Sequence, residues 1–380
     1  MLLHLLSDNK FANYPIRQFD SSLGTVNEFV VLVPDRHKPL QNVGDNKSIK
    51  VIKYNSVDFY LLCKSLSKYS AIIIHNFHHE CHVEIIESAA GKTNIVWVFW
   101  GFEYYRRKKT QTKFLGPRTF CLYMRNVIPK RLRNFVGIIK HRSFEPDRYE
   151  VPKKIFKKID YCLTHIYEDF QIAKQQLPGD YKFLWYSYYS IEDTIGELID
   201  SKVNGNNILV GNSAFYSNNH LEAFQKLSKL DVRERNIVVP LSYGNTWYAN
   251  RILNRGREIF KEDFDPLMSF LELEEYNRKL QSCSIVIMNH HRQQALGNLI
   301  TSLWLGSKVY ISKKSSTYDY FNRIGINFYT VEDDLIPDNQ QALKPLKKKL
   351  VTQNREILFR EYSKKKLDES ILNIVRELNV

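Results

Sequence analysis

The feature that most constrains the fold is an alternation of short, β-branched apolar runs with longer segments of helical pattern. Apolar runs of about four to eight residues predict buried strands, and alternation with helices predicts a parallel sheet covered on both faces. In the first half of the chain we expect strands at residues 2–6, 28–33, 48–54, 71–75, 94–100 and 160–164, and helices at 56–68, 82–90 and 167–177.

A polar stretch rich in Gly and Asn, residues 201–207, interrupts this pattern and predicts a domain boundary. A second α/β pattern follows, and a chain of 380 residues is long enough for two domains. We therefore expect domains at 1–200 and 206–337, followed by terminal helices at 338–380, which in such folds often return to the first domain. The expected strands of the second domain are 208–211, 236–240, 267–270, 284–288, 308–311 and 327–329, and its helices are 220–230, 246–260, 272–282, 297–305 and 317–324.

Composition excludes several classes of protein. Hydrophobic residues make up 43% and charged residues 25% of the chain, as is ordinary for globular proteins. No apolar run approaches the roughly 18–20 residues of a membrane span, and the apolar N-terminus has no basic region of a signal peptide. On this basis we expect a cytoplasmic chain. The five cysteines form no CxxC pair, which favours free thiols, although a metal site at Cys81 among neighbouring histidines stays a minor alternative.

The net charge of +14 is concentrated in one segment. Residues 106–142 hold twelve Lys or Arg and no Asp or Glu, interleaved with bulky apolar side chains. This composition is typical of a helix in an anionic membrane interface; a solvated basic face and a nucleic-acid contact are the alternatives. We expect the membrane and the acceptor to be contacted by these cations: Arg106, Arg107, Lys108, Lys109, Arg118, Arg125, Lys130, Arg131 and Arg133.

Three polar clusters of the second half follow expected strands, where a doubly wound domain binds ligands. Residues 289–298 are the most polar of them, and Arg292 at the start of a helix is suited to clamp a diphosphate without a metal ion. The turns at 211–213 and 240–244 supply glycines, donors and an aromatic ring. The candidate donor-binding residues are Gly211, Asn212, Ser213, Pro240, Tyr243, Gly244, Glu272, Tyr276, Asn289, Arg292, Gln293, Gln294, Gly297 and Asn298.

Within these candidates we expect a division of labour. Arg292, Gln293 and the 211–213 turn would bind a diphosphate, whereas Tyr243 and the 272–276 group would bind a nucleoside. The Asp-x-Asp motif at 263–265 is interpreted as structural, because it lies in an expected loop between a helix and a strand. No metal site and no cofactor are therefore predicted.

In the first half, polar residues end three expected strands at one edge of the sheet. Asp8, His75 and Glu103 are the candidates for a base that deprotonates an acceptor hydroxyl, with a cap or turn role as the alternative for each.

Five stretches of the chain together form a recognisable pattern: 4–8, 100–105, 208–213, 238–240 and 271–297, the last including Arg292-Gln293-Gln294. With this pattern the chain resembles the bacterial family of TDP-4-acetamido-4,6-dideoxy-D-galactose (Fuc4NAc):lipid II transferases, 4-alpha-L-fucosyltransferase-like glycosyltransferases. The resemblance covers most of the chain and is strongest in the second half. Two departures are that the family has Asp where this chain has Glu103, and Gly where it has Ala295.

The resemblance implies a GT-B fold, in which two Rossmann-like domains face each other across a cleft. It also implies a dTDP-sugar donor, an undecaprenyl-diphosphate-linked acceptor, and a peripheral enzyme on the cytoplasmic face of the bacterial inner membrane. The predicted function is metal-independent transfer of a deoxyamino sugar in surface polysaccharide synthesis, without nucleic acid as a partner. The alternatives are a GT-B-fold sugar-nucleotide epimerase and a basic peripheral protein that binds lipid or nucleic acid.

Overall fold

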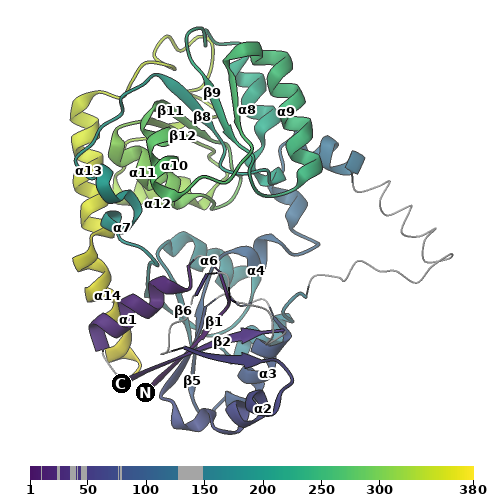
Figure 1. The fold of residues 1–380 in the computed structure, drawn as a ribbon, viewed down its shortest axis with the longest axis vertical. Helices are drawn as coiled ribbons and strands as arrows, with labels where there is room; N and C mark the ends of the chain where they lie inside the picture. Colours follow the sequence, from purple (N-terminus) through teal and green to yellow (C-terminus); the bar gives the residue numbers. More distant parts are fainter. Residues whose placement is uncertain are drawn as a thin grey trace, which may run out of the picture. The chain divides into compact units, whose positions relative to one another are not determined.

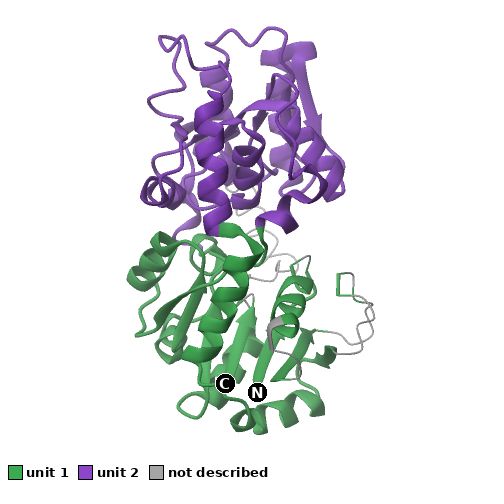
Figure 2. Ribbon diagram, turned by 90° about the vertical axis from the view of Figure 1, so that its left-hand side faces the viewer, with its two compact units in different colours: residues 1–107, 148–190, 362–380 green, residues 108–147, 191–361 purple. Residues whose placement is uncertain are grey.

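The computed structural model describes residues 1–9, 11–23, 26–34, 40, 42–43, 49–75, 77, 79–126 and 149–380. The chain divides into two compact units, coloured separately in Figure 2. Unit 1 comprises residues 1–107, 148–190 and 362–380, and unit 2 comprises 108–147 and 191–361. The chain therefore passes from unit 1 to unit 2 between residues 190 and 191, whereas the sequence predicted a boundary at 201–207. Residues 108–126, the described part of the basic segment after Arg107, belong to unit 2 and not to the first domain.

The described part of unit 1 contains a parallel seven-stranded sheet in the order β3-β2-β1-β4-β5-β6-β7. The central strands are buried on both faces, which explains their continuous apolar runs. The expected strands at 2–6 and 71–75 are confirmed, whereas the short edge strand β7 was not predicted. The strands are β1 (Leu2–Leu6), β2 (Asn27–Val33), β3 (Ile49–Lys53), β4 (Ala71–His75), β5 (Asn94–Val98), β6 (Tyr161–Thr164) and β7 (Lys182–Trp185).

Helices cover both faces of this sheet (Figure 1). The last helix, α14, returns to unit 1 and packs beside α1. Ile371 and Ile374 of this helix, and Leu378 directly after it, are part of the same core as β1 and β2. The described α-helices of unit 1 are α1 (Asn13–Leu23), α2 (Val57–Lys64), α3 (Glu80–Ala89), α4 (Phe102–Tyr105), α6 (Tyr167–Gln176) and α14 (Lys364–Glu377).

Unit 2 contains a second parallel sheet, in the order β10-β9-β8-β11-β12-β13. From β8 the chain first adds β9 and β10 on one side of the sheet, and then β11, β12 and β13 on the other side. The position between β8 and β11 is therefore a topological switch point, where ligands bind in doubly wound folds. The expected strand at 267–270 was wrong, because β10 ends at Leu267 and contains Pro266, which an edge strand tolerates. The strands are β8 (Asn207–Val210), β9 (Ile237–Pro240), β10 (Phe264–Leu267), β11 (Cys283–Met288), β12 (Lys308–Ile311) and β13 (Tyr329–Thr330).

The helices of unit 2 bury their apolar faces on this sheet, and Phe224, Tyr248 and Ile252 belong to its core. Asn245 caps α9 by accepting a hydrogen bond from the backbone N–H of Tyr248. The described α-helices are α7 (Ile191–Ile195), α8 (His220–Leu227), α9 (Thr246–Phe260), α10 (Leu273–Gln281), α11 (Leu296–Leu305), α12 (Ser316–Ile324) and α13 (Lys348–Tyr362).

Candidate active site

The turns that follow β8, β9 and β11 meet at the switch point of unit 2. Gly211 directly follows β8 and has a φ angle of +70°. A Cβ atom at this position would lie 2.5 Å from Nε2 of His220 and 2.7 Å from Oδ1 of Asn218. Both of those side chains are fully buried. Glycine is therefore required here for two reasons, the left-handed backbone and the close approach of the two polar side chains.

Replacing Gly211 by Ala should destabilise unit 2 by roughly 2–4 kcal/mol, because left-handed strain and a steric clash act together. The matched control is Gly196→Ala, since Gly196 also has a positive φ angle but no described neighbouring atom lies within 4 Å of the position that an added Cβ would take. Chemical denaturation of both variants measures the difference. Equal losses of stability would contradict the clash.

Asn218, at the end of a short 3-10 helix, organises the turn after β8. Its Oδ1 accepts from the backbone N–H of Asn212 at 2.8 Å and from Nε2 of His290 at 2.9 Å. Its Nδ2 donates to Oγ of Ser213 at 3.1 Å. Burial lowers the pKa of His290 well below its ordinary value, so this ring is neutral and one nitrogen donates. Asn218 and His290 thus connect the turns after β8 and β11, a role that the sequence analysis missed.

Gln294 connects three turns through one chain of hydrogen bonds. Its Oε1 accepts from Oγ of Ser217 at 2.7 Å, and its Nε2 donates to Oδ1 of Asn212 at 2.9 Å. Asn212 in turn donates to the hydroxyl of Tyr243 at 2.9 Å. Tyr243 is 45% exposed, so its ring is accessible to a ligand. The predicted donor residues Asn212, Tyr243 and Gln294 therefore lie together.

Arg292 lies at the same edge of the sheet, after β11. Its guanidinium donates to the carbonyl oxygen of Gln293 at 3.1 Å and to Oγ of Ser217 at 3.4 Å. The side chain is only partly buried, and it is an always-charged, planar donor. Arg292 and the polar chain through Gln294 share the hydroxyl of Ser217, which brings a cation to the accessible side of the cluster.

The other predicted donor residues occupy different positions around the cluster. Gly244, with φ +125°, brings the turn after β9 against Ala214, and Pro240 is the buried last residue of β9. Asn298 donates to the hydroxyl of Tyr276 at 2.8 Å, which links α11 to α10. Glu272 is an exposed residue at the N-terminus of α10. The backbone carbonyl of Asn289 accepts from Asn219, and Gly297 lies in the first turn of α11.

Ala295 has a φ angle of +58° at the N-terminus of α11, where the resembling family has Gly. A left-handed conformation disfavours any residue with a Cβ atom. We therefore expect Ala295→Gly to raise the stability of the protein by roughly 0.5–1 kcal/mol and its melting temperature by about 1–3 °C. Ala249→Gly, in the interior of α9, should instead lower it. A decrease for Ala295→Gly would show that this backbone is not strained.

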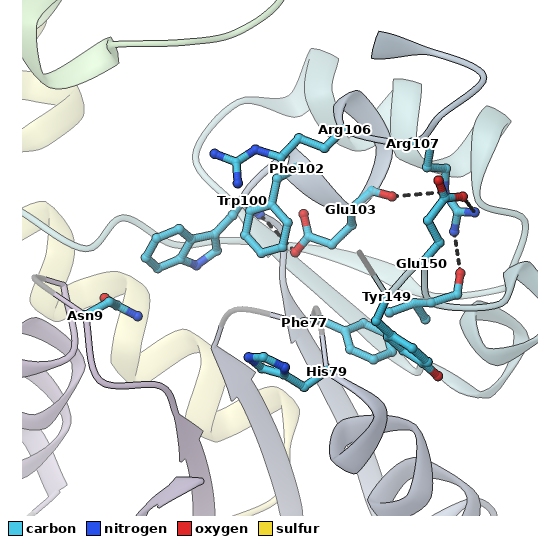
Figure 3. A pocket seen from close by; sticks show the side chains of 11 residues that line it. Asn9, Phe77, His79, Trp100, Phe102, Glu103, Arg106, Arg107, Tyr149 and Glu150 are labelled. Carbon is cyan, nitrogen blue, oxygen red and sulfur yellow. Dashed lines mark hydrogen bonds and ion pairs between the residues drawn. The ribbon is translucent and has the colours of Figure 1, made fainter. Parts of the chain in front are cut away.

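Unit 1 contains a pocket of about 560 Å³ at the carboxyl ends of its strands. Four aromatic side chains, Phe77, Trp100, Phe102 and Tyr149, contribute to its wall, and Glu103 is more deeply buried than the other carboxylate of the lining, Glu150 (Figure 3). The residues that line the pocket are Asn9, Phe77, His79, Trp100, Phe102, Glu103, Arg106, Arg107, Tyr149, Glu150 and Val151.

Glu103 is the second residue of α4, which begins at Phe102 directly after the left-handed N-cap residue Gly101. Its Oε1 accepts from Nε1 of Trp97 at 3.1 Å and from the backbone N–H of Trp100 at 3.5 Å, and its buried Oε2 has no hydrogen-bond partner among the residues that the structure describes. Figure 3 shows the side chain directed toward Trp100. Burial raises the pKa of Glu103 to about 7. A carboxyl group with this pKa is matched to proton transfer near neutral pH.

The other two predicted bases do not line this pocket. Oδ1 of Asp8 accepts a hydrogen bond from the backbone N–H of Asn42 at 2.8 Å, a contact that stabilises the loop at Asn42. His75 is 2% exposed and hydrogen-bonds to His4 and Tyr188. Its place is in the core between β1 and β4. Glu103 is thus the predicted base that the structure places at a cavity.

The cations of the basic segment have several different environments. Arg106 lines the pocket with its guanidinium over the ring of Phe102, at 5.7 Å. Arg107 forms an ion pair with Glu150 at 3.7 Å and donates to the carbonyl oxygen of Glu103 at 3.0 Å. Arg118 donates to Gln225 of α8. Lys108, Lys109 and Arg125 are also described, whereas Lys130, Arg131 and Arg133 lie outside the described residues.

Several of the residues 111–126 contact α8 and the residue that precedes it in unit 2. Asn219 accepts from the backbone N–H of Gly116 at 2.7 Å, and Glu222 accepts from both the N–H and the hydroxyl of Thr119. Leu122 packs against the core of unit 2. The carboxylate of Glu222 therefore caps the helix at 117–126, although it belongs to a different helix.

Two further expectations concern metals and membranes. Among the residues that the structure describes, no group of three His, Cys, Asp or Glu side chains is arranged to hold a metal ion. Within the same residues, no helix combines the length and the apolar character needed to cross a membrane.

The family model for 4-alpha-L-fucosyltransferases, glycosyl transferase group 56, matches residues 165–372, which is more than half of the chain. The chain belongs to this family. The protein is therefore a glycosyltransferase, as the sequence predicted. The matched region contains the whole polar cluster of unit 2, from Gly211 to Asn298, but not the pocket around Glu103 in unit 1.

Solved structures confirm the fold of this glycosyltransferase. A glycosyltransferase from Rickettsia africae ESF-5 has a TM-score of 0.65 at 12% identity, with 100% of this chain and 98% of that chain covered. HepE of Anabaena in complex with UDP and glucose has a TM-score of 0.63 at 8% identity, with 99% of each chain covered. The trehalose 6-phosphate synthase of Burkholderia multivorans has a TM-score of 0.59 at 10% identity, with 100% and 96% covered. At these identities the similarity shows the GT-B fold alone.

Proposed function

We propose that this glycosyltransferase moves a deoxyamino sugar from a dTDP-sugar in unit 2 to a saccharide on undecaprenyl diphosphate in unit 1, with Glu103 as the base. The acceptor hydroxyl attacks C1 of the donor sugar and its proton passes to Oε2 of Glu103. The bond from C1 to the phosphate oxygen breaks, and dTDP leaves. The observation that carries this proposal is the carboxyl group of Glu103 in the lining of the pocket, with a pKa of about 7 and a buried Oε2 that has no hydrogen-bond partner among the described residues.

The donor part of the proposal rests on the cluster of unit 2. Arg292 offers a positive charge in the same hydrogen-bonded cluster as the accessible ring of Tyr243, and a diphosphate and a nucleobase need these two kinds of group. The HepE structure contains UDP and glucose, which supports a nucleotide-sugar donor on this fold. Charge from Arg292 and from backbone N–H groups could stabilise the leaving diphosphate without a metal ion or other cofactor.

The membrane part of the proposal rests on the basic composition of residues 106–142. A lipid-linked acceptor requires the pocket to work at a membrane surface, and each cation near an anionic surface contributes about 1 kcal/mol. We place the enzyme peripherally on the cytoplasmic face of the inner membrane, without nucleic acid as a partner. Flotation with anionic and with neutral liposomes tests this: binding to neither would contradict it.

The test of the donor is a thermal-shift series with dTDP, UDP and GDP, since a ligand that binds the folded state raises its apparent stability. We expect the largest shift with dTDP, and the same shift in the presence of EDTA. A transfer assay with the matching nucleotide sugar then measures turnover. No shift with any nucleotide, or a shift that EDTA abolishes, would contradict the donor or the metal-independent part of the proposal.

A further inference from the structure

A chain of five buried or partly buried side chains begins at the pocket and runs into the core of unit 1. The indole Nε1 of Trp100 donates to the hydroxyl of Tyr188 at 2.6 Å. That hydroxyl lies 3.0 Å from Nδ1 of His75, whose Nε2 lies 3.2 Å from Nδ1 of His4. Nε2 of His4 lies 3.2 Å from Oδ1 of Asn27. The chain connects the ends of β5 and β4 with β1 and the start of β2.

The direction of every hydrogen bond in this chain is determined by its two ends. An indole N–H can only donate, so the Tyr188 oxygen accepts from Trp100 and its O–H donates to His75. At the other end the Asn27 amide donates to the carbonyl oxygen of Phe19, which leaves its Oδ1 to accept from His4. Burial lowers the pKa of both histidines, so each ring is neutral and has one donor and one acceptor nitrogen. All bonds are satisfied with one tautomer of each histidine.

Burying such a chain of polar side chains costs more free energy of desolvation than burying apolar side chains. Leu2, Phe29 and Ile73 lie on the same face of these strands, and apolar residues at the positions of the chain would avoid the cost of desolvating imidazole and amide groups. A fully satisfied polar network instead fixes one orientation of its members. The member that reaches the pocket is Trp100, so the orientation that is fixed at the ligand-facing end is that of the indole.

Trp100 lines the same pocket as Glu103 and lies three residues before it. Its N–H is used by Tyr188, and its ring makes edge contacts with Phe11 and Tyr188 at centroid distances of 5.0 Å. What the indole offers to a ligand is therefore apolar ring surface. The C–H groups of a sugar ring form an apolar face that packs on aromatic rings, while its hydroxyls need polar partners. Trp100 and Glu103 provide both within one pocket.

We propose that Trp100 is the platform on which a sugar ring of the acceptor stacks beside Glu103, and that Tyr188, His75 and His4 are positioning residues that fix this indole. The inference rests on the proposed function, in which the pocket of unit 1 receives the acceptor saccharide. It assigns His75 to positioning, whereas the sequence had suggested it as a base.

The test compares Tyr188→Phe with Tyr186→Phe in the full-length enzyme. Tyr186 is a matched control, because its buried hydroxyl donates to Gln18 at 2.9 Å and is not part of the chain to Trp100. Transfer is measured with synthetic undecaprenyl-diphosphate-linked saccharides as acceptors, varying acceptor and donor separately. We expect Tyr188→Phe to raise the acceptor KM about tenfold, as the loss of one fixed hydrogen bond would, with the donor KM unchanged. Tyr186→Phe should leave both KM values unchanged.

Trp100→Phe provides a second variant that keeps an aromatic ring but has no N–H. It should raise the acceptor KM as Tyr188→Phe does, and the double variant should be no worse than the poorer single variant, because both changes break the same bond. An unchanged acceptor KM in Tyr188→Phe and Trp100→Phe, or an equal rise in Tyr186→Phe, would overturn the platform while leaving Glu103 as base. Absence of transfer by the wild type to every acceptor would overturn the proposed function and the platform together.

Discussion

Glu103→Gln should lower kcat by about 100- to 10,000-fold, the usual contribution of a general base. The amide has nearly the same shape, and its oxygen can still accept from Trp97, so the pocket should stay intact. Only the ability to accept a proton at Oε2 is lost. Steady-state transfer assays with saturating donor and acceptor measure the effect, and donor-induced thermal shifts should be the same as in the wild type.

The pH dependence of the wild type tests the same assignment. The base must be ionised to act, so kcat/KM should rise with pH up to about 7, the pKa of Glu103, and then level off. The Arg107 guanidinium interacts electrostatically with this carboxyl group and donates to the backbone carbonyl oxygen of Glu103. Arg107 stays cationic over this range, so it adds no further step. In Glu103→Gln the rise with pH should be absent from the residual activity.

Stability should change in the opposite sense. The folded-state pKa of Glu103 is about 7, above the ordinary value of 4.5, so the folded protein binds this proton more tightly than the unfolded chain. The resulting stabilisation is present below pH 4.5 and is lost as the pH rises to 7, by on the order of 3 kcal/mol. Gln does not titrate, so the variant should gain stability relative to the wild type over this interval, as measured by denaturation at pH 5 and pH 8.

Two variants complete the design. Glu103→Asp, the residue of the resembling family, withdraws the carboxylate by one methylene group and should keep part of the activity. Asp169→Asn removes another buried carboxylate of unit 1, one that accepts from the hydroxyl of Tyr105 at 2.9 Å, and should leave the pH profile of catalysis unchanged. Full activity of Glu103→Gln would mean that another group accepts the proton.

The sequence predicted the two sheets well, because their strands are buried on both faces and read as continuous apolar runs. Edge strands lack that pattern. The strand β7, which begins with Lys182 and Phe183, was not predicted, and β10 was not predicted at its true position because it contains Pro266. The polar cluster around Arg292 could be predicted because its residues follow one strand directly. The fold class, the family and the glycosyltransferase assignment are confirmed, whereas the individual donor residues stay predictions.

The parts of the site that could not be predicted depend on contacts between residues far apart in the chain. Trp100 and Tyr188 are 88 residues apart, and the sequence around one of them does not predict a contact with the other. Asn219 takes a left-handed conformation with φ +51°, and from there its side chain reaches both Gly116 and Asn289. A sequence pattern shows which residues end a strand, but not which of the three candidate bases has a buried carboxyl oxygen without a partner among the described residues. Only the fold distinguishes Glu103 from Asp8 in this respect.

Arg292→Ala should lower kcat/KM by about 100- to 1,000-fold, the cost of removing one group that stabilises charge in a transition state. Negative charge grows on the diphosphate as the bond to the sugar breaks, so both kcat and nucleotide affinity should fall. Arg292→Lys keeps the charge but loses the planar fork, and should recover only part of the activity. Assays at saturating donor separate the effect on kcat from that on binding.

A matched control for this loss of charge is Arg251→Ala. Arg251 is an exposed arginine of α9 in the same unit, with its guanidinium over the ring of Trp247 at 5.0 Å and outside the polar cluster. Its removal lowers the net charge by the same amount, so any general electrostatic effect on an anionic donor should appear equally in both variants. The nucleotide-induced thermal shift should persist in Arg251→Ala and be lost in Arg292→Ala. If both variants keep the shift, groups other than Arg292 bind the diphosphate. The alternative is then the backbone N–H donors at the turns after β8 and β11, because such donors can bind an anion without a charged side chain.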